Sequence, residues 1–209
     1  MKQILFTLAL ALVYLVAPAQ SFEGKVVYNN TYKSKTPGLS DGQLSSMMGN
    51  LQSWYIKGGD YRSETNGEQM VWQLYRSGEN KVYSKLAGSA ALLWNDGASN
   101  PDSVLSTTLR RDATEILGYK CDELTLVCRS GVQKYYFSSK LQVDPNLYKG
   151  HRFGNWYAFL SKAHAVPLMM VIETPQFTME SVASGVHPMS LDNAFFALPA
   201  DAKTMKSPY

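Results

Sequence analysis

Apolar and polar side chains alternate along most of the chain after residue 20, as is typical of strands with one buried face. Phe22, Val26 and Tyr28, for example, fall on one face of the first such run. The pattern predicts strands over residues 22–32, 54–56, 61–64, 70–75, 81–83, 115–128, 132–137, 167–173 and 178–186.

Short turn sequences separate many of these predicted strands. Asn66-Gly67 predicts a two-residue type I′ turn, because both residues tolerate a positive φ angle. Gly58-Gly59-Asp60 and Arg129-Ser130-Gly131 predict two more hairpins. Consecutive hairpins indicate an antiparallel sheet rather than parallel strands joined by helices.

One stretch has a helical period instead. The spacing i, i+3, i+4 and i+7 of its apolar residues predicts an amphipathic helix through Leu44, Met47, Met48 and Leu51. Ser40 precedes this run and Gln43 follows three residues later, as in a capping box. Further short helices are expected near residues 155–161 and 191–195.

The predicted strand at residues 70–75 is apolar on both faces, so it has to be covered on both sides. We therefore expect a mainly β (α+β) domain: a curved antiparallel sheet, or half-open barrel, of consecutive hairpins with one to three short helices covering its concave face. Such a cover can leave an apolar cavity beneath the helix.

Five side chains are the candidate ligand-binding residues: Met47, Met48, Trp54, Trp72 and Tyr75. The two methionines would form a lid that repacks around different ligands, because methionine is unbranched and flexible. The three aromatic residues would line the cavity. The alternative is that the aromatic residues of the strands only pack the core.

The first 19 residues have the pattern of a secretory signal peptide. Lys2 supplies a positive charge, residues 4–16 are almost entirely apolar, and small residues at Ala17 and Ala19 predict cleavage after Ala19. An uncleaved anchor is the alternative. Residues 20–209 then form a single domain in the periplasm or outside the cell, with no transmembrane segment in the mature chain.

Charge and cysteine content narrow the function classes. The formal net charge is +3 and both signs are scattered, so no basic stripe for nucleic acid is present.

Cys121 and Cys128 lie seven residues apart on a predicted strand, and seven steps of about 3.3 Å separate their Cα atoms by roughly 23 Å. A disulfide needs a much shorter distance, so we expect two free, buried thiols unless the strand is broken.

Catalytic and metal-binding patterns are absent from the sequence. His151, His164 and His187 are far apart, and the chain has no HExxH, GxSxG, P-loop or GxGxxG motif. We therefore expect that the protein is not an enzyme, and that it has no cofactor and no catalytic residue.

Asp102-Ser103-Val104 matches a loose pattern for O-glycosylation in some Gram-negative secreted proteins, a pattern that is also common by chance.

Three segments resemble a known family in the same order along the chain: FEGKVVY at 22–28, ILGYKC at 116–121 and FALP at 196–199. They resemble a bacterial secreted domain-of-unknown-function family that is related to the GLPGLI-type proteins, although the GLPGL segment is missing here. Those proteins look like the LolA/LolB-like periplasmic lipoprotein-carrier superfamily. The resemblance implies a half-open barrel, a periplasmic location and an apolar ligand such as a lipid or a lipoprotein acyl chain. It brings no catalytic residues, and the arginine that locks the lid of such carriers matches no position in this chain.

Two function classes follow for the mature chain. The first is a non-enzymatic periplasmic protein that binds or carries a lipid or other apolar ligand between sheet and helix. The alternative is a cell-envelope structural or protein-interaction module.

Overall fold

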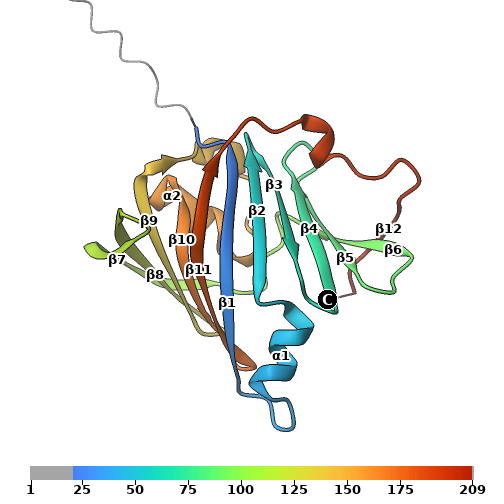
Figure 1. The fold of residues 1–209 in the computed structure, drawn as a ribbon, viewed down its shortest axis with the longest axis horizontal. Coiled ribbons are helices and arrows are strands. Elements are labelled where there is room, and N and C mark those ends of the chain that lie inside the picture. Colours follow the sequence, from blue (N-terminus) through green and yellow to red (C-terminus); the bar gives the residue numbers. More distant parts are fainter. Residues whose placement is uncertain (1–20, 209) are drawn as a thin grey trace, which may run out of the picture.

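The computed structural model describes residues 21–208, which form one strongly curved sheet (Figure 1). The expected signal peptide at residues 1–19 lies outside the described residues. The helices and strands are β1 (Gly24–Ser34), α1 (Asp41–Met48), β2 (Leu51–Lys57), β3 (Asp60–Thr65), β4 (Met70–Arg76), β5 (Lys81–Leu86), β6 (Ala91–Asp96), β7 (Val104–Ile116), β8 (Tyr119–Cys128), β9 (Val132–Gln142), α2 (Trp156–Ala163), β10 (Ala165–Glu173), β11 (Phe177–Pro188) and β12 (Lys203–Lys206). Three short 3-10 helices are η1 (Pro145–Tyr148), η2 (Phe153–Asn155) and η3 (Asn193–Phe196).

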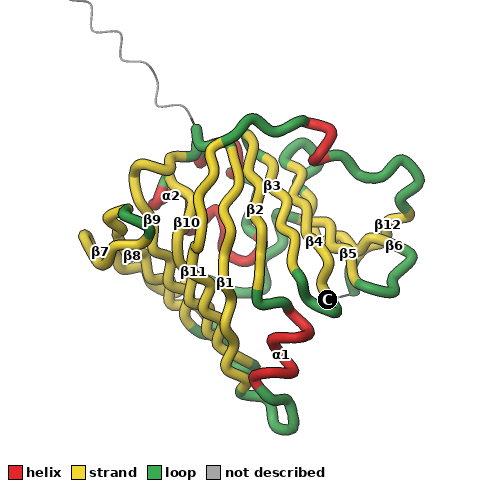
Figure 2. The backbone as a smooth tube through the Cα atoms, in the orientation of Figure 1, coloured by secondary structure: helices red, strands yellow, loops and turns green. Residues whose placement is uncertain are grey.

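The 12 strands form a single sheet in the order β12-β6-β5-β4-β3-β2-β1-β11-β10-β9-β8-β7 (Figure 2). β1 joins two series of antiparallel strands, because Gly24 pairs with Ile56 of β2 on one side and with Pro188 of β11 on the other. The expected curved sheet of mainly antiparallel strands is confirmed. One pair departs from it: β12 runs parallel to β6, because the C-terminal segment crosses the sheet before it reaches this edge.

One strand prediction and one turn prediction need correction. The strand predicted over residues 115–128 is divided by a two-residue turn at Leu117 and Gly118, which have φ angles of 51° and 78°. At Asn66-Gly67 the predicted type I′ turn is wrong, since neither residue has a positive φ. A side chain on Gly67 would overlap the backbone of Met48, so the glycine is needed for close approach to the end of α1.

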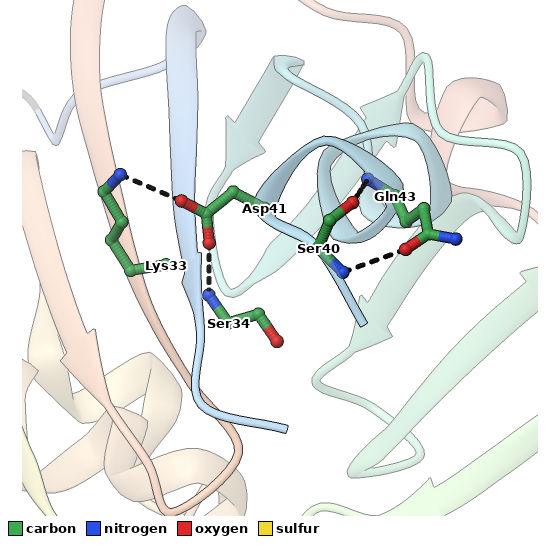
Figure 3. Close-up of polar contacts among 5 residues, drawn as sticks. All are labelled: Lys33, Ser34, Ser40, Asp41 and Gln43. Carbon is green, nitrogen blue, oxygen red and sulfur yellow. Dashed lines mark hydrogen bonds and ion pairs between the residues drawn. The ribbon is translucent and has the colours of Figure 1, made fainter. Parts of the chain in front are cut away.

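The capping box predicted for α1 is present (Figure 3). The amide of Gln43 donates to the Ser40 hydroxyl (3.2 Å), and the amide of Ser40 donates to the Gln43 side-chain oxygen (2.9 Å). Asp41 accepts from the amide of Ser34 and pairs with Lys33, so the start of α1 is held against the end of β1. α1 nevertheless ends at Met48, and Leu51 belongs to β2 and is 45% exposed.

The helix that covers the concave face is α2 rather than α1. α1 connects β1 with β2 at one end of the sheet (Figure 1), and Leu44 is its one buried residue. α2 packs against β8, β9 and β10. Its buried side chains are Trp156, Phe159, Leu160 and Ala163. α1 packs against β1, and the lid predicted at Met47 and Met48 stays a prediction.

Apolar side chains pack on both faces of the sheet. The larger cluster fills the concave side beneath α2, and includes Tyr75 of β4. A second cluster on the convex side joins Leu74 to Leu191 and Phe196 of the C-terminal segment. The sequence-based expectation that residues 70–75 are covered on both sides is thus met, on the convex side by residues near η3.

Candidate ligand cavity

A cavity of about 370 Å³ lies on the concave side, where β1–β4 face β9–β11 and the start of α2. This volume is within the range of small-molecule sites in proteins. No charged side chain is among the described residues that line it. Its apolar and aromatic lining residues are Tyr32, Met48, Trp54, Tyr61, Met70, Tyr135, Trp156, Met170, Ile172 and Met179.

Two tryptophans form one wall of this cavity. The rings of Trp54 in β2 and Trp156 in α2 have centroids 4.9 Å apart. Both indole N–H groups are buried and have no hydrogen-bond acceptor among the described residues. Gly154 and Asn155 precede Trp156 in left-handed conformation, and this tight turn sets the position from which α2 starts.

Behind the tryptophans lies a group of stacked, uncharged rings. His151 is 1% exposed, its ring centroid lies 3.9 Å from that of Tyr75, and its Nε2 atom is 2.9 Å from the Tyr61 hydroxyl. Burial lowers the pKa of His151 to about 3, so the imidazole is neutral at physiological pH. Burial also raises the pKa of Tyr61 far above its usual range. Neither group is suited to exchange protons near neutral pH.

Polar side chains on adjacent strands form part of the cavity floor. Gln52 donates from its side-chain nitrogen to the Ser63 hydroxyl at 2.7 Å. Gln73 makes the same kind of bond to Ser84 at 3.2 Å. On the other side of β1, the hydroxyl of Ser181 donates to Asn30 at 2.6 Å. The floor therefore contains neutral amides and hydroxyls that bond to one another in pairs.

A second cavity of about 640 Å³ adjoins the first along the concave side of β4–β6. Met70 and Gln73 line both cavities, so they form the boundary between them. The loop after β6 and Phe153 of η2 contribute to its other wall. A further depression of about 630 Å³ lies near Ser21, where the described chain begins, and includes Glu23 and Lys140.

The structure brings together only two of the five predicted ligand-binding residues. Met48 and Trp54 line the cavity of about 370 Å³. Met47 is partly exposed on α1 and does not line it. Trp72 lies on the convex face, where the Arg62 guanidinium is 4.9 Å from its ring centroid, because residues 72 and 73 of β4 point to opposite faces.

Tyr75 is on the concave side but belongs to the packed core. It is 1% exposed, and its hydroxyl donates to Asn80 at 3.0 Å.

The sequence-based prediction did not assign Trp156, Met170, Ile172 or Met179 to the cavity. The aromatic group around Trp156 was the available signal, whereas the methionines of β10 and β11 have no distinguishing pattern.

The two cysteines are free and buried, as expected from their spacing on one strand. Asn155 donates to the sulfur of Cys128 at 3.4 Å, and burial raises the pKa of this thiol to about 11.

Within residues 21–208 no group of three or more His, Cys, Asp or Glu side chains could hold a metal ion. In the same part of the chain, no helix is long and apolar enough to span a membrane.

No protein-family model matches this sequence, and no curated protein matches it either. Solved structures that are similar to this chain include the following two. A crystal structure of an uncharacterised conserved protein from Thermus thermophilus is 10% identical, with a TM-score of 0.46 over 88% of this chain and 91% of that one. LprF from Mycobacterium bovis is 13% identical, with a TM-score of 0.33 over 82% of this chain and 89% of that one. At these identities and TM-scores neither likeness indicates a ligand, reaction or partner, and the resemblance to GLPGLI-type proteins stays a prediction.

Proposed function

We propose that this protein is a non-enzymatic binder or carrier that holds a lipid or other apolar ligand in the concave cavity. The observation that carries this proposal is the cavity of about 370 Å³ with mainly apolar and aromatic walls. Concave sites with mainly apolar walls and a few polar groups are the usual setting of small-molecule binding in proteins. The lining of this cavity has that character, which supports an apolar ligand.

Methionines support an apolar ligand of variable shape. Met48, Met70, Met170 and Met179 come from four different elements and all line the cavity. Their unbranched side chains can change rotamer without loss of contact. The cavity can therefore adjust to the ligand and can connect with the adjoining space beyond Met70.

The titratable groups beside the cavity support a role without catalysis. His151 and Tyr61 have pKa values displaced away from neutrality by burial. Tyr135, which lines the cavity, likewise has a raised pKa because it is buried. A general acid or base works best with a pKa near the operating pH, so these residues are better suited to a stable, uncharged wall.

Ligand binding can be tested with the folded mature chain. We expect native mass spectrometry of protein purified gently from its source to show a bound apolar molecule. We also expect Nile red, a neutral dye, to bind with enhanced fluorescence. The variant Ile172→Trp places a large ring in the cavity and should weaken dye binding by roughly tenfold.

The matched control is Val171→Trp on the same strand. Val171 does not line the cavity and points to the opposite face, so its substitution should leave dye binding unchanged. Absence of both a bound molecule and dye binding in a folded sample would contradict the carrier proposal.

We further propose that the protein works after export, in the periplasm or outside the cell. The support is the sequence pattern of residues 1–19, together with the apolar ligand that the cavity suggests. Mass analysis of the protein from the envelope fraction should give a chain that begins at Gln20. Recovery of the full-length chain from the cytoplasmic fraction alone would contradict it.

A cell-envelope interaction module is the second candidate, and the edge strand β7 favours it. Within the described chain β7 pairs only with β8, and its Leu105 and Leu109 are 66% and 41% exposed. The unpaired backbone groups of an edge can accept a strand of another protein. A single stoichiometric partner captured from envelope extract, and lost in the Leu105→Lys/Leu109→Lys double variant, would support this function.

A further inference from the structure

We infer that the cavity selects an uncharged amphiphile with hydroxyl or amide N–H groups, such as a monoacylglycerol, over an ionised fatty acid. This inference rests on the proposed function and names the ligand class for the same cavity.

The first step is the distribution of charge around the cavity. Charged side chains occur next to its lining residues, but at alternate positions of the same strands. Arg62 and Glu64 flank Ser63 in β3, and pair with each other at 2.9 Å. Because successive residues of a strand point to opposite faces, these charges belong to the convex side. A carboxylate in this cavity would find no cation among its described lining residues. Lys206 lines the adjoining cavity beyond Met70 and Gln73, and Asp96 lines that same cavity.

The second step is the polarity that the floor does offer. The side-chain nitrogens of Gln52 and Gln73 donate to Ser63 and Ser84. No hydrogen bond within residues 21–208 involves their side-chain oxygens, and neither oxygen is among the buried unpaired atoms, so both are open to a ligand or to water in the cavity that the two glutamines line. An amide oxygen accepts hydrogen bonds and does not donate them. A ligand with hydroxyl or amide N–H groups can donate to these two oxygens, whereas an ionised carboxylate cannot.

The third step is the free energy of desolvation. An ionised carboxylate loses its hydration in an apolar site, and without a cation this loss raises the pKa of the acid and weakens binding of the charged form. A neutral glycerol or amide head loses less on burial, and it regains hydrogen bonds by donating to the glutamine oxygens. For two ligands with the same acyl chain, this difference in the free energy of desolvation should appear as a difference between their dissociation constants.

The test compares two probes with the same chain, decanoic acid and 1-monodecanoylglycerol, both below their micelle concentrations. At about pH 8 the acid is ionised. We expect isothermal titration calorimetry to give a dissociation constant at least roughly tenfold lower for the monoacylglycerol. Equal affinities, or tighter binding of the acid, would overturn the inference and leave the carrier proposal standing. Failure of both probes and of Nile red would instead count against the carrier proposal itself.

A variant that introduces a positive charge into the cavity sharpens the test. Gln52→Lys places a cation on the cavity floor and removes one acceptor, so it should shift the preference toward decanoic acid. Ser53→Lys is the matched control, because it adds the same charge one residue away on the opposite face. Gln73→Lys provides a second site if the first variant does not fold, as judged by circular dichroism. An unchanged preference in a folded Gln52→Lys or Gln73→Lys variant would overturn the inference.

Discussion

The Nε2 atom of His151 lies 2.9 Å from the Tyr61 hydroxyl oxygen, in a region that the sequence indicated only as a polar loop and a strand. This contact joins the segment between η1 and η2 to β3, and it supports the wall behind Trp54 and Trp156. The Nδ1 atom of His151 has no partner among the described residues. The ring is therefore held mainly by stacking, and by one hydrogen bond.

The first prediction concerns the pH dependence of stability. The pKa of His151 is lowered to about 3 in the folded chain, whereas an exposed histidine in the unfolded chain has a pKa of about 6.5. Between these values the unfolded state binds the extra proton, so the histidine lowers the free energy of unfolding as the pH falls below about 6.5. Its contribution is largest above that pH and should fall by roughly 1.4 kcal/mol per pH unit below it.

Urea unfolding at several pH values measures this effect. In the variant His151→Phe, which keeps an aromatic ring but cannot be protonated, the slope between about pH 5 and 6.5 should be smaller than in the parent chain. Identical slopes would show that His151 is accessible to protons in the folded state.

The second prediction concerns the thiols. Cys121 and Cys128 are 0% and 5% exposed, and burial raises the pKa of both. Because the thiolate is the reactive form, Ellman's reagent should label neither cysteine in the native protein and both after denaturation. The intact mass should also be unchanged by reductant. Rapid labelling of the native protein, or a two-hydrogen mass gain on reduction, would contradict the structure.

The third prediction concerns the start of α1. Ser40→Ala removes the hydroxyl that accepts from the Gln43 amide, and should lower the free energy of unfolding by about 1 kcal/mol. Ser45→Ala makes the same chemical change inside the helix, away from the cap, and should be nearly neutral. Equal effects of the two substitutions in denaturant unfolding would mean that the capping box does not stabilise the fold.

The fourth prediction concerns the convex cover. Phe196 is 4% exposed and packs with Leu74 and Leu191, so Phe196→Ala should lower the free energy of unfolding by about 3–5 kcal/mol. Met205→Ala is a control near the same end of the chain, because Met205 is 52% exposed and should contribute little. A small effect of Phe196→Ala would show that the C-terminal segment is dispensable for the sheet.

The sequence by itself determined the local features of this protein. Alternation along β1 and β9, the capping box at Ser40 and the separation of the two cysteines each depend on residues close together in the chain. Such features follow from backbone periodicity and short-range hydrogen bonds. The sequence also required covers on both faces of β4, although it did not show which segments supply them.

Only the tertiary structure decided which residues meet in the cavity. Trp54 and Trp156 are about a hundred residues apart, and their contact depends on how β2 and α2 lie across the curved sheet. The face of Trp72 depends on strand register, since a shift of one residue exchanges the two faces. Curvature, register and the placement of α2 come from packing between distant segments, which the local pattern of the sequence does not contain.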